Sequence, residues 1–107
     1  QKVRSLIINQ FNDAFSRFDC IAMPTCPTTA FKIGELIEDP MAMYLADIAT
    51  IPINLAGLPG LSIPCGFSNE NLPYGLQLVG KRFDEDSILK IGHHYQSITE
   101  HHLQEAF

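Results

Sequence analysis

Residues 61–80 read L-S-I-P-C-G-F-S-N-E-N-L-P-Y-G-L-Q-L-V-G, two apolar segments on either side of a polar turn. Residues 61–65 and 74–80 have the length and composition of β-strands, and the polar residues 68–73 predict the turn that joins them. Pro64 has no backbone N–H to donate, which places the first strand at a sheet edge or beside a bulge. The stretch therefore predicts two consecutive strands.

A helix and a short strand are predicted near the start of the chain. Apolar residues recur at helical spacing over residues 1–18, so we expect an amphipathic helix that begins before the first residue. The apolar run 19–23 follows and predicts a buried strand. Pro24 and Pro27 then rule out both helix and regular strand pairing.

A second helix is predicted in the middle of the chain. Asp39 and Pro40 form a helix-start signal, a capping carboxylate followed by proline at the first helical position. We expect this helix to end near Thr50 and to be followed by irregular apolar chain over residues 51–59.

A last helix follows the second strand of the opening stretch, capped by Asp84 or Asp86. The order is then helix-strand-helix-strand-strand-helix, an α/β arrangement with helices packed on a β-sheet. Three strands make a thin core and leave bare sheet edges. We therefore expect residues 1–107 to be an incomplete part of a single domain that has a larger mixed sheet.

The composition is apolar and lightly charged, with 46% hydrophobic and 18% charged residues in 107 and a net charge of −5. These values exclude intrinsic disorder and leave no basic footprint for nucleic acid. They also indicate that other protein covers part of the apolar surface. We expect that surface over residues 48–67 or over the stripe of Phe11, Phe15 and Phe18.

No charged residue lies between Asp47 and Glu70. Three prolines interrupt this run and would break a lipid-exposed helix, so we expect buried, turning chain rather than a membrane span. The three cysteines form no C-x-x-C pair, which argues against a disulfide framework or a zinc site. Free thiols favour a reducing compartment, most simply the cytoplasm.

Two motifs resemble reactive sites but have plainer interpretations. Ser62 lies in G-L-S-I-P, close to the G-x-S-x-G turn of serine hydrolases, but its neighbours continue a strand. The pairs His93-His94 and His101-His102 recur eight apart on the last predicted helix, whereas helical metal ligands are three or four apart. We expect a strand serine, a polar helix face and no metal site.

Asp47 and Asn54 break local rules. Asp47 falls in the last turn of the second predicted helix, where the helix dipole disfavours an anion by about 0.3–1 kcal/mol. A carboxylate at the mouth of an apolar pocket could hold a cationic group, and the alternative is a solvated helix end. Asn54 is an amide in an apolar run and needs partners if it is buried, or it pins a loop.

Two long segments carry a family resemblance. The stretch M-Y-L-A-D-I-A-T-I-P-I-N-L-A-G-L-P-G-L-S-I-P-C-G-F, followed by L-P-Y-G-L-Q-L-V-G-K-R-F-D-E-D-S-I-L, resembles the C-terminal part of the amidase signature family. The upstream run D-C-I-A-M-P-T-C-P-T-T-A-F-K-I-G-E matches as well. Within the family, the I-P-C-G-F and G-K-R-F-D-E pieces are most similar to the A subunits of glutamyl-tRNA(Gln) or aspartyl/glutamyl-tRNA amidotransferases.

The resemblance implies a glutamine-hydrolysing subunit whose catalytic residues lie elsewhere. The family uses a Ser–cis-Ser–Lys triad in a Gly/Ser-rich segment, and the present sequence contains no such segment. The serine would attack the glutamine side-chain amide and release ammonia. We therefore expect no catalytic residue in these 107 residues and no activity from them alone.

The resemblance also implies partners. Ammonia would pass to a B subunit, where ATP and Mg²⁺ activate Glu-tRNA(Gln) for conversion to Gln-tRNA(Gln), in a heterotrimer with a C subunit. The rest of the A subunit would complete the domain, and no cofactor would bind this chain itself. Alternatives are part of a stand-alone amidase acting on small carboxamides, or a non-catalytic interaction module.

Three residues receive roles from the resemblance. Asp47 matches the aspartate that binds the α-ammonium of glutamine. Asn54 and Gly57 match a loop that shapes the substrate pocket.

Overall fold

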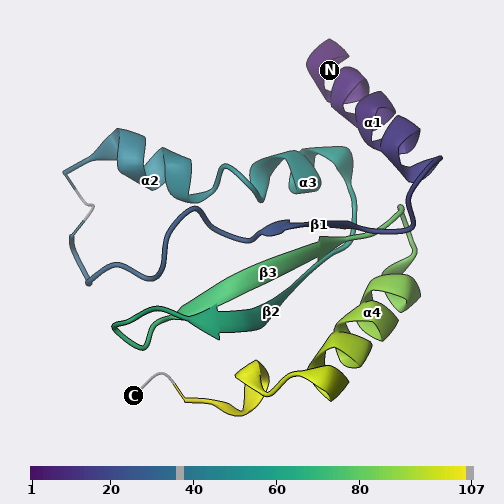
Figure 1. Cartoon of the computed structure of the whole chain (residues 1–107). Coiled ribbons are helices and arrows are strands. Elements are labelled where there is room, and N and C mark those ends of the chain that lie inside the picture. The colour runs from purple at the N-terminus through teal and green to yellow at the C-terminus, as the bar shows by residue number, and fades with distance from the viewer. Residues whose placement is uncertain (36–37, 106–107) are drawn as a thin grey trace.

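The computed structural model describes residues 1–35 and 38–105. These residues form four α-helices, three β-strands and one short 3-10 helix, shown in Figure 1. In chain order they are α1 (Lys2–Phe15), β1 (Ile21–Pro24), α2 (Pro40–Ala46), α3 (Ile51–Ala56), β2 (Gly60–Phe67), β3 (Pro73–Val79), α4 (Glu85–Ile98) and η1 (His101–Leu103).

The three strands form an antiparallel sheet with the order β1-β3-β2. The strand β3 is central, so the predicted strand with Pro64 lies at an edge. The pairing of β2 with β3 also shifts between Pro64 and Gly66, which marks a bulge at the proline. Both consequences predicted from the missing N–H of Pro64 are confirmed. The strand β1 is shorter than expected and alternates half-buried and exposed residues instead of being buried.

Helices cover both faces of the sheet (Figure 1). On one face α1 and α3 pack over a cluster built from Phe15, Ile53 and Val79. On the other face Ile88 of α4 packs against Ile63 and Leu78 of the sheet. This arrangement confirms the predicted α/β class, and the larger mixed sheet stays a prediction.

The middle of the chain differs from the prediction. The second helix ends at Ala46, and a turn over residues 47–50 leads into α3, where irregular chain was expected. The prediction was wrong because Pro52 lies within the first two positions of α3, where its missing N–H costs no helical hydrogen bond. Gly57 ends α3 with φ 68° and ψ 36°, a left-handed conformation that favours glycine.

The described residues expose more surface than a self-contained domain of this mass. The accessible area is 7815 Å², whereas a compact monomer of this size exposes about 6,000 Å². The radius of gyration is 15.5 Å, against about 13 Å for a compact chain of this length. The accessible area and the radius of gyration are large because the core between the helices and the sheet is thin.

Apolar side chains account for part of that exposed surface. Phe11 and Phe15 pack into the core, whereas Phe18, the third residue of that stripe, is exposed. More exposed apolar residues lie on α2, the turn that follows and α3, and only the last three of them fall within the predicted range 48–67: Met41, Met43, Tyr44, Leu45, Ile48, Ile51 and Leu55. We call this set the α2–α3 apolar face.

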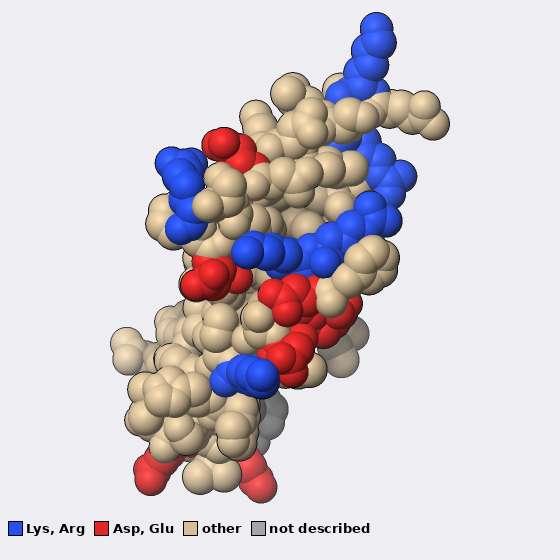
Figure 2. Space-filling view, turned by 90° about the vertical axis from the view of Figure 1, so that its right-hand side faces the viewer, with Lys and Arg blue, Asp and Glu red and all other residues tan. Residues whose placement is uncertain are grey.

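Charged residues are mixed in sign on the side of the molecule seen in Figure 2, where basic and acidic side chains lie next to one another. The two ion pairs among the described residues, Arg17–Asp13 and Lys90–Asp86, are exposed. Within residues 1–35 and 38–105, no helix is both long and apolar enough to cross a bilayer.

Candidate functional site

The turn that carries Asp47 has a fixed backbone and an exposed side chain. Asp47 caps the C-terminal end of α2, and its carbonyl oxygen accepts hydrogen bonds from the backbone N–H groups of Thr50 and Ile51, both at 3.0 Å. The hydroxyl of Thr50 donates to the same oxygen at 3.2 Å. No hydrogen bond or ion pair reaches the Asp47 carboxylate from the described part of the chain. An anion on a rigid turn is thus available to a cationic group.

One long-range hydrogen bond joins this turn to the sheet. Gln77 lies at the centre of β3 and is only 5% exposed. Its side-chain Nε2 donates to the backbone carbonyl of Ala49 at 3.0 Å. The turn is thereby held at a fixed distance from the middle strand.

A small cavity with a mixed polar and apolar lining lies beside the turn, between α3 and the sheet. Its volume is about 260 Å³. The lining residues are Thr25, Thr50, Ile53, Asn54, Leu58, Gly60, Leu61, Ser62 and Gln77. Across it the hydroxyls of Thr25 and Ser62 share a hydrogen bond of 2.7 Å.

The three residues singled out by the sequence lie along one short segment. The backbone N–H of Asn54 donates to the carbonyl of Thr50, next to the Asp47 turn, and the N–H of Gly57 donates to the carbonyl of Asn54. Asn54 is exposed on α3 and lines the cavity, so it is not the buried amide considered from the sequence. Gly57 ends the helix. Their roles in binding stay predictions.

A second, larger space lies on the other side of the turn. It has a volume of about 860 Å³ and lies between α2 and residues 27–35, with Lys32 and Glu35 in its lining. Ala46, the residue before Asp47, lines this space, whereas Thr50 lines the smaller cavity. Asp47 itself is in the lining of neither space, so its neighbours on the turn, and not its carboxylate, border these cavities.

The structure confirms the strand serine, whereas the last helix does not carry both histidine pairs as predicted. Ser62 lies within β2, and its hydroxyl is hydrogen-bonded to that of Thr25 rather than to a base. His93 and His94 are exposed on α4, but His101 and His102 lie in η1, because α4 ends at Ile98. No group of three His, Cys, Asp or Glu residues in the described ranges is arranged to hold a metal ion.

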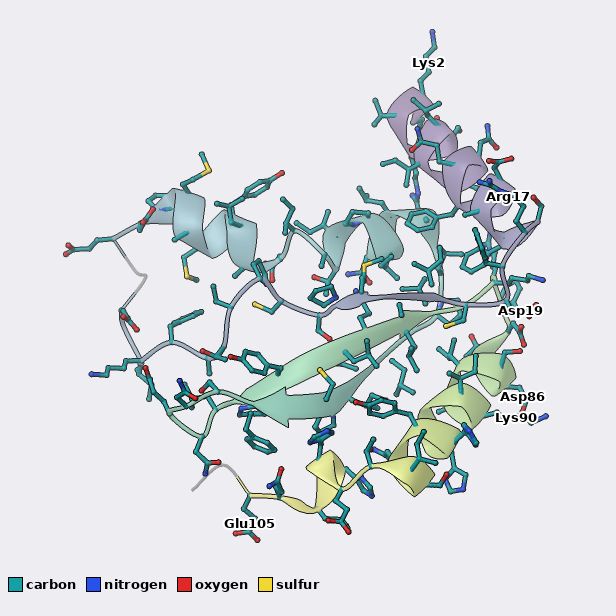
Figure 3. The ribbon with its side chains drawn as sticks, viewed as in Figure 1. Lys2, Arg17, Asp19, Asp86, Lys90 and Glu105 are labelled. Atoms are coloured by element: carbon teal, nitrogen blue, oxygen red, sulfur yellow. The ribbon has the colours of Figure 1, made fainter. Side chains whose placement is uncertain are left out.

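The charged side chains labelled in Figure 3 lie at the periphery, away from the space between α3 and the sheet. Asp86 and Lys90 pair with each other at 2.9 Å on the outer side of α4. This bond raises the pKa of the Lys90 ammonium. Burial raises the pKa of the Cys20 thiol, which lowers the fraction present as the nucleophilic thiolate.

Gln77 and Thr25 were missed by the sequence reasoning. The available signal for Gln77 was a polar residue between Leu76 and Leu78 in a strand that is otherwise apolar. An amide in such a place must find a hydrogen-bond partner, as Gln77 does. Thr25 carried no signal, because its contact with Ser62 joins residues 37 positions apart.

Comparisons with known proteins agree on one family. The amidase family profile matches residues 1–89. The A subunit of the glutamyl-tRNA(Gln) amidotransferase of Bacillus cereus (strain AH187) is 52% identical over 106 residues, and that of Bacillus mycoides (strain KBAB4) is 51% identical. Each alignment covers 99% of this chain and 22% of the relative, so the chain spans about a fifth of the length of these relatives.

Solved structures give the same result. The crystal structure of the glutamyl-tRNA(Gln) amidotransferase A subunit from Thermotoga maritima matches with a TM-score of 0.74 and 57% identity, over 78% of this chain and 18% of that one. A 6-aminohexanoate cyclic dimer hydrolase matches with a TM-score of 0.65 over 80% of this chain and 20% of that one. Its identity of 21% establishes likeness of fold alone.

Proposed function

The chain belongs to the amidase family, and from this membership we propose that it is the C-terminal part of the glutamine-hydrolysing A subunit of a glutamyl-tRNA(Gln) amidotransferase. The observation that carries the proposal is the identity of 52% with such subunits along 99% of the chain. That likeness favours an amidotransferase subunit over a stand-alone amidase.

The proposed reaction needs residues from outside this chain. A serine hydroxyl attacks the side-chain amide carbon of glutamine, the C–N bond breaks, and ammonia leaves an acyl-enzyme that water hydrolyses to glutamate. The present chain supplies the binding contact. The Asp47 carboxylate, exposed on its rigid turn, accepts a charge-assisted hydrogen bond from the α-ammonium of glutamine.

Asn54 and Gly57 shape the pocket in this proposal. Asn54 lines the cavity beside the Asp47 turn. Gly57 lets the chain reverse after α3. Its φ of 68° is a left-handed backbone conformation that costs free energy in a residue with a Cβ. In this proposal both residues shape the pocket by fixing the path of the backbone around it.

ATP and Mg²⁺ belong to the partner B subunit in this proposal. The B and C subunits bind the A subunit, and charged tRNA binds through the assembly. We place the assembly in the cytoplasm and not on a membrane.

The rest of the A subunit covers the surface that this chain leaves exposed. The α2–α3 apolar face lies next to the Asp47 turn, and burying it in a single larger domain would also partly desolvate the binding site. Desolvation strengthens a charge-assisted hydrogen bond, since screening by water is reduced.

Reconstitution tests the proposal. The complete protein that contains this chain is combined with candidate B and C subunits, ATP, Mg²⁺, Glu-tRNA(Gln) and glutamine. We expect formation of Gln-tRNA(Gln) that depends on glutamine or on ammonium. Hydrolysis of simple carboxamides without any amidation of Glu-tRNA(Gln) would instead identify a stand-alone amidase.

A further inference from the structure

Gln77 is the buried polar side chain of the described core. It lies at the centre of the sheet, paired on one side with Met23 and on the other with Ser62. It is only 5% exposed, and it lines the small cavity beside the Asp47 turn. The hydrogen bond from Nε2 to the Ala49 carbonyl spans 28 positions in the chain.

This bond has no substitute in the described part of the chain. The other hydrogen bonds of residues 47–50 run to α2, to the start of α3 or within the turn itself. They fix the shape of the turn but not its position over the sheet. The Gln77 bond to Ala49 is the hydrogen bond among the described residues that joins the turn to the sheet, and the packing of Ile53 in α3 against Val79 supports the same placement.

The other end of the Gln77 amide lies near Gly60 and Ile53. A Cβ built on Gly60 would lie 3.4 Å from the Oε1 of Gln77 and 3.6 Å from Ile53. The Oε1 end of the side chain therefore faces the open side of Gly60, next to the cavity that Gln77 also lines. The bond from Nε2 is the contact through which Gln77 can position the turn.

We propose that Gln77 is a positioning residue for glutamine, acting through the Ala49 carbonyl on the Asp47 turn. The proposal rests on the proposed function, in which Asp47 binds the α-ammonium. That ammonium is remote from the amide that reacts, so its contact is made equally in the ground state and in the transition state. Displacing Asp47 then raises the KM for glutamine and leaves kcat unchanged.

The test uses the complete protein with its partner subunits. Gln77→Met keeps the length of the side chain and removes the donor. Gln77→Glu is a second variant that keeps the outline and presents an acceptor to the Ala49 carbonyl. We expect the KM for glutamine to rise about tenfold in both, with kcat within about twofold. The ammonium-driven rate should stay unchanged, because ammonia does not use the Asp47 contact.

Leu78→Val is the matched control. Leu78 is the next residue of β3, is 4% exposed, and packs on the opposite face against Ile63 and Ile88. A purely structural effect of disturbing β3 would appear in this variant too. We expect its KM for glutamine to equal that of the unmodified protein.

A double-mutant cycle separates the two proposals. If Gln77 acts through Asp47, Gln77→Met adds nothing to the KM of Asp47→Asn. Three results would overturn the positioning role of Gln77. The KM for glutamine could stay unchanged in both Gln77 variants, or the effects of Gln77→Met and Asp47→Asn on KM could multiply in the double variant. The third such result is loss of ammonium-driven activity in both Gln77 variants. An Asp47→Asn variant with normal glutamine use would overturn the proposed role of Asp47, and the Gln77 proposal with it.

Discussion

We expect replacement by alanine to have opposite effects on stability at two glycines of the sheet, Gly75 and Gly60. A Cβ on Gly75 would lie 2.9 Å from the Thr25 hydroxyl oxygen, 3.0 Å from that of Ser62 and 3.1 Å from the Thr25 Cβ. A Cβ on Gly60 would meet no atom closer than 3.4 Å. The first position is closed and the second has room for a methyl group.

We therefore expect Gly75→Ala to lower the free energy of unfolding of the complete protein by about 1–3 kcal/mol, as overpacking does. Gly60→Ala should be neutral or stabilising by up to about 1 kcal/mol, since alanine restricts the unfolded chain. Denaturant titration of the two variants measures both values. Equal losses would show that the space around the Thr25–Ser62 hydrogen bond is not as described.

At the same scale, the sequence drew attention to one amide and passed over another. Asn54 stood out in an apolar run but is exposed, whereas Gln77 is buried and bonded to a turn 28 residues away. Local sequence shows that a residue is polar. It does not show which helix or turn will lie above a given strand residue. The position of the turn above Gln77 decides where the buried hydrogen bond to Ala49 forms.

At the scale of elements, local chemistry predicted boundaries well where a single residue decides them. Asp39 caps α2 by accepting a hydrogen bond from the Ala42 N–H at 3.1 Å, and Pro64 marks an edge strand with a bulge. The helix α3 was missed, since its six residues are too few for a clear apolar period. Its support comes from packing of Ile53 against Phe15 and Val79, which are distant in sequence.

The two aspartate caps provide a test at this scale. Asp39→Ala removes a capping hydrogen bond and should destabilise the protein by about 1 kcal/mol. Asp84 occupies the same position before α4 but makes no side-chain hydrogen bond to it. Asp84→Ala should therefore cost less, and unfolding midpoints of the two variants give the comparison. A larger loss for Asp84→Ala would contradict the described capping.

For the whole molecule, the main observation is the large surface area that it exposes. The chain has about 30% more accessible surface than a compact monomer of its mass. It also matches about a fifth of the length of its relatives. The family could be predicted from long sequence segments, whereas the hydrogen bond between Gln77 and the Asp47 turn depends on how α3 packs over the sheet, which local sequence does not show. The chain itself has a hydrogen-bonded turn with an exposed carboxylate beside exposed apolar residues.

The most direct test of the account compares two nitrogen donors in one variant, Asp47→Asn, in the complete enzyme with its partner subunits. Losing a charge-assisted hydrogen bond costs about 1.5–3 kcal/mol, which corresponds to a loss of about tenfold to hundredfold in kcat/KM for glutamine. Ammonium-driven amidation of Glu-tRNA(Gln) should keep its rate, because ammonia bypasses the Asp47 contact. An equal fall with both donors would contradict the account and assign Asp47 to the stability of the fold.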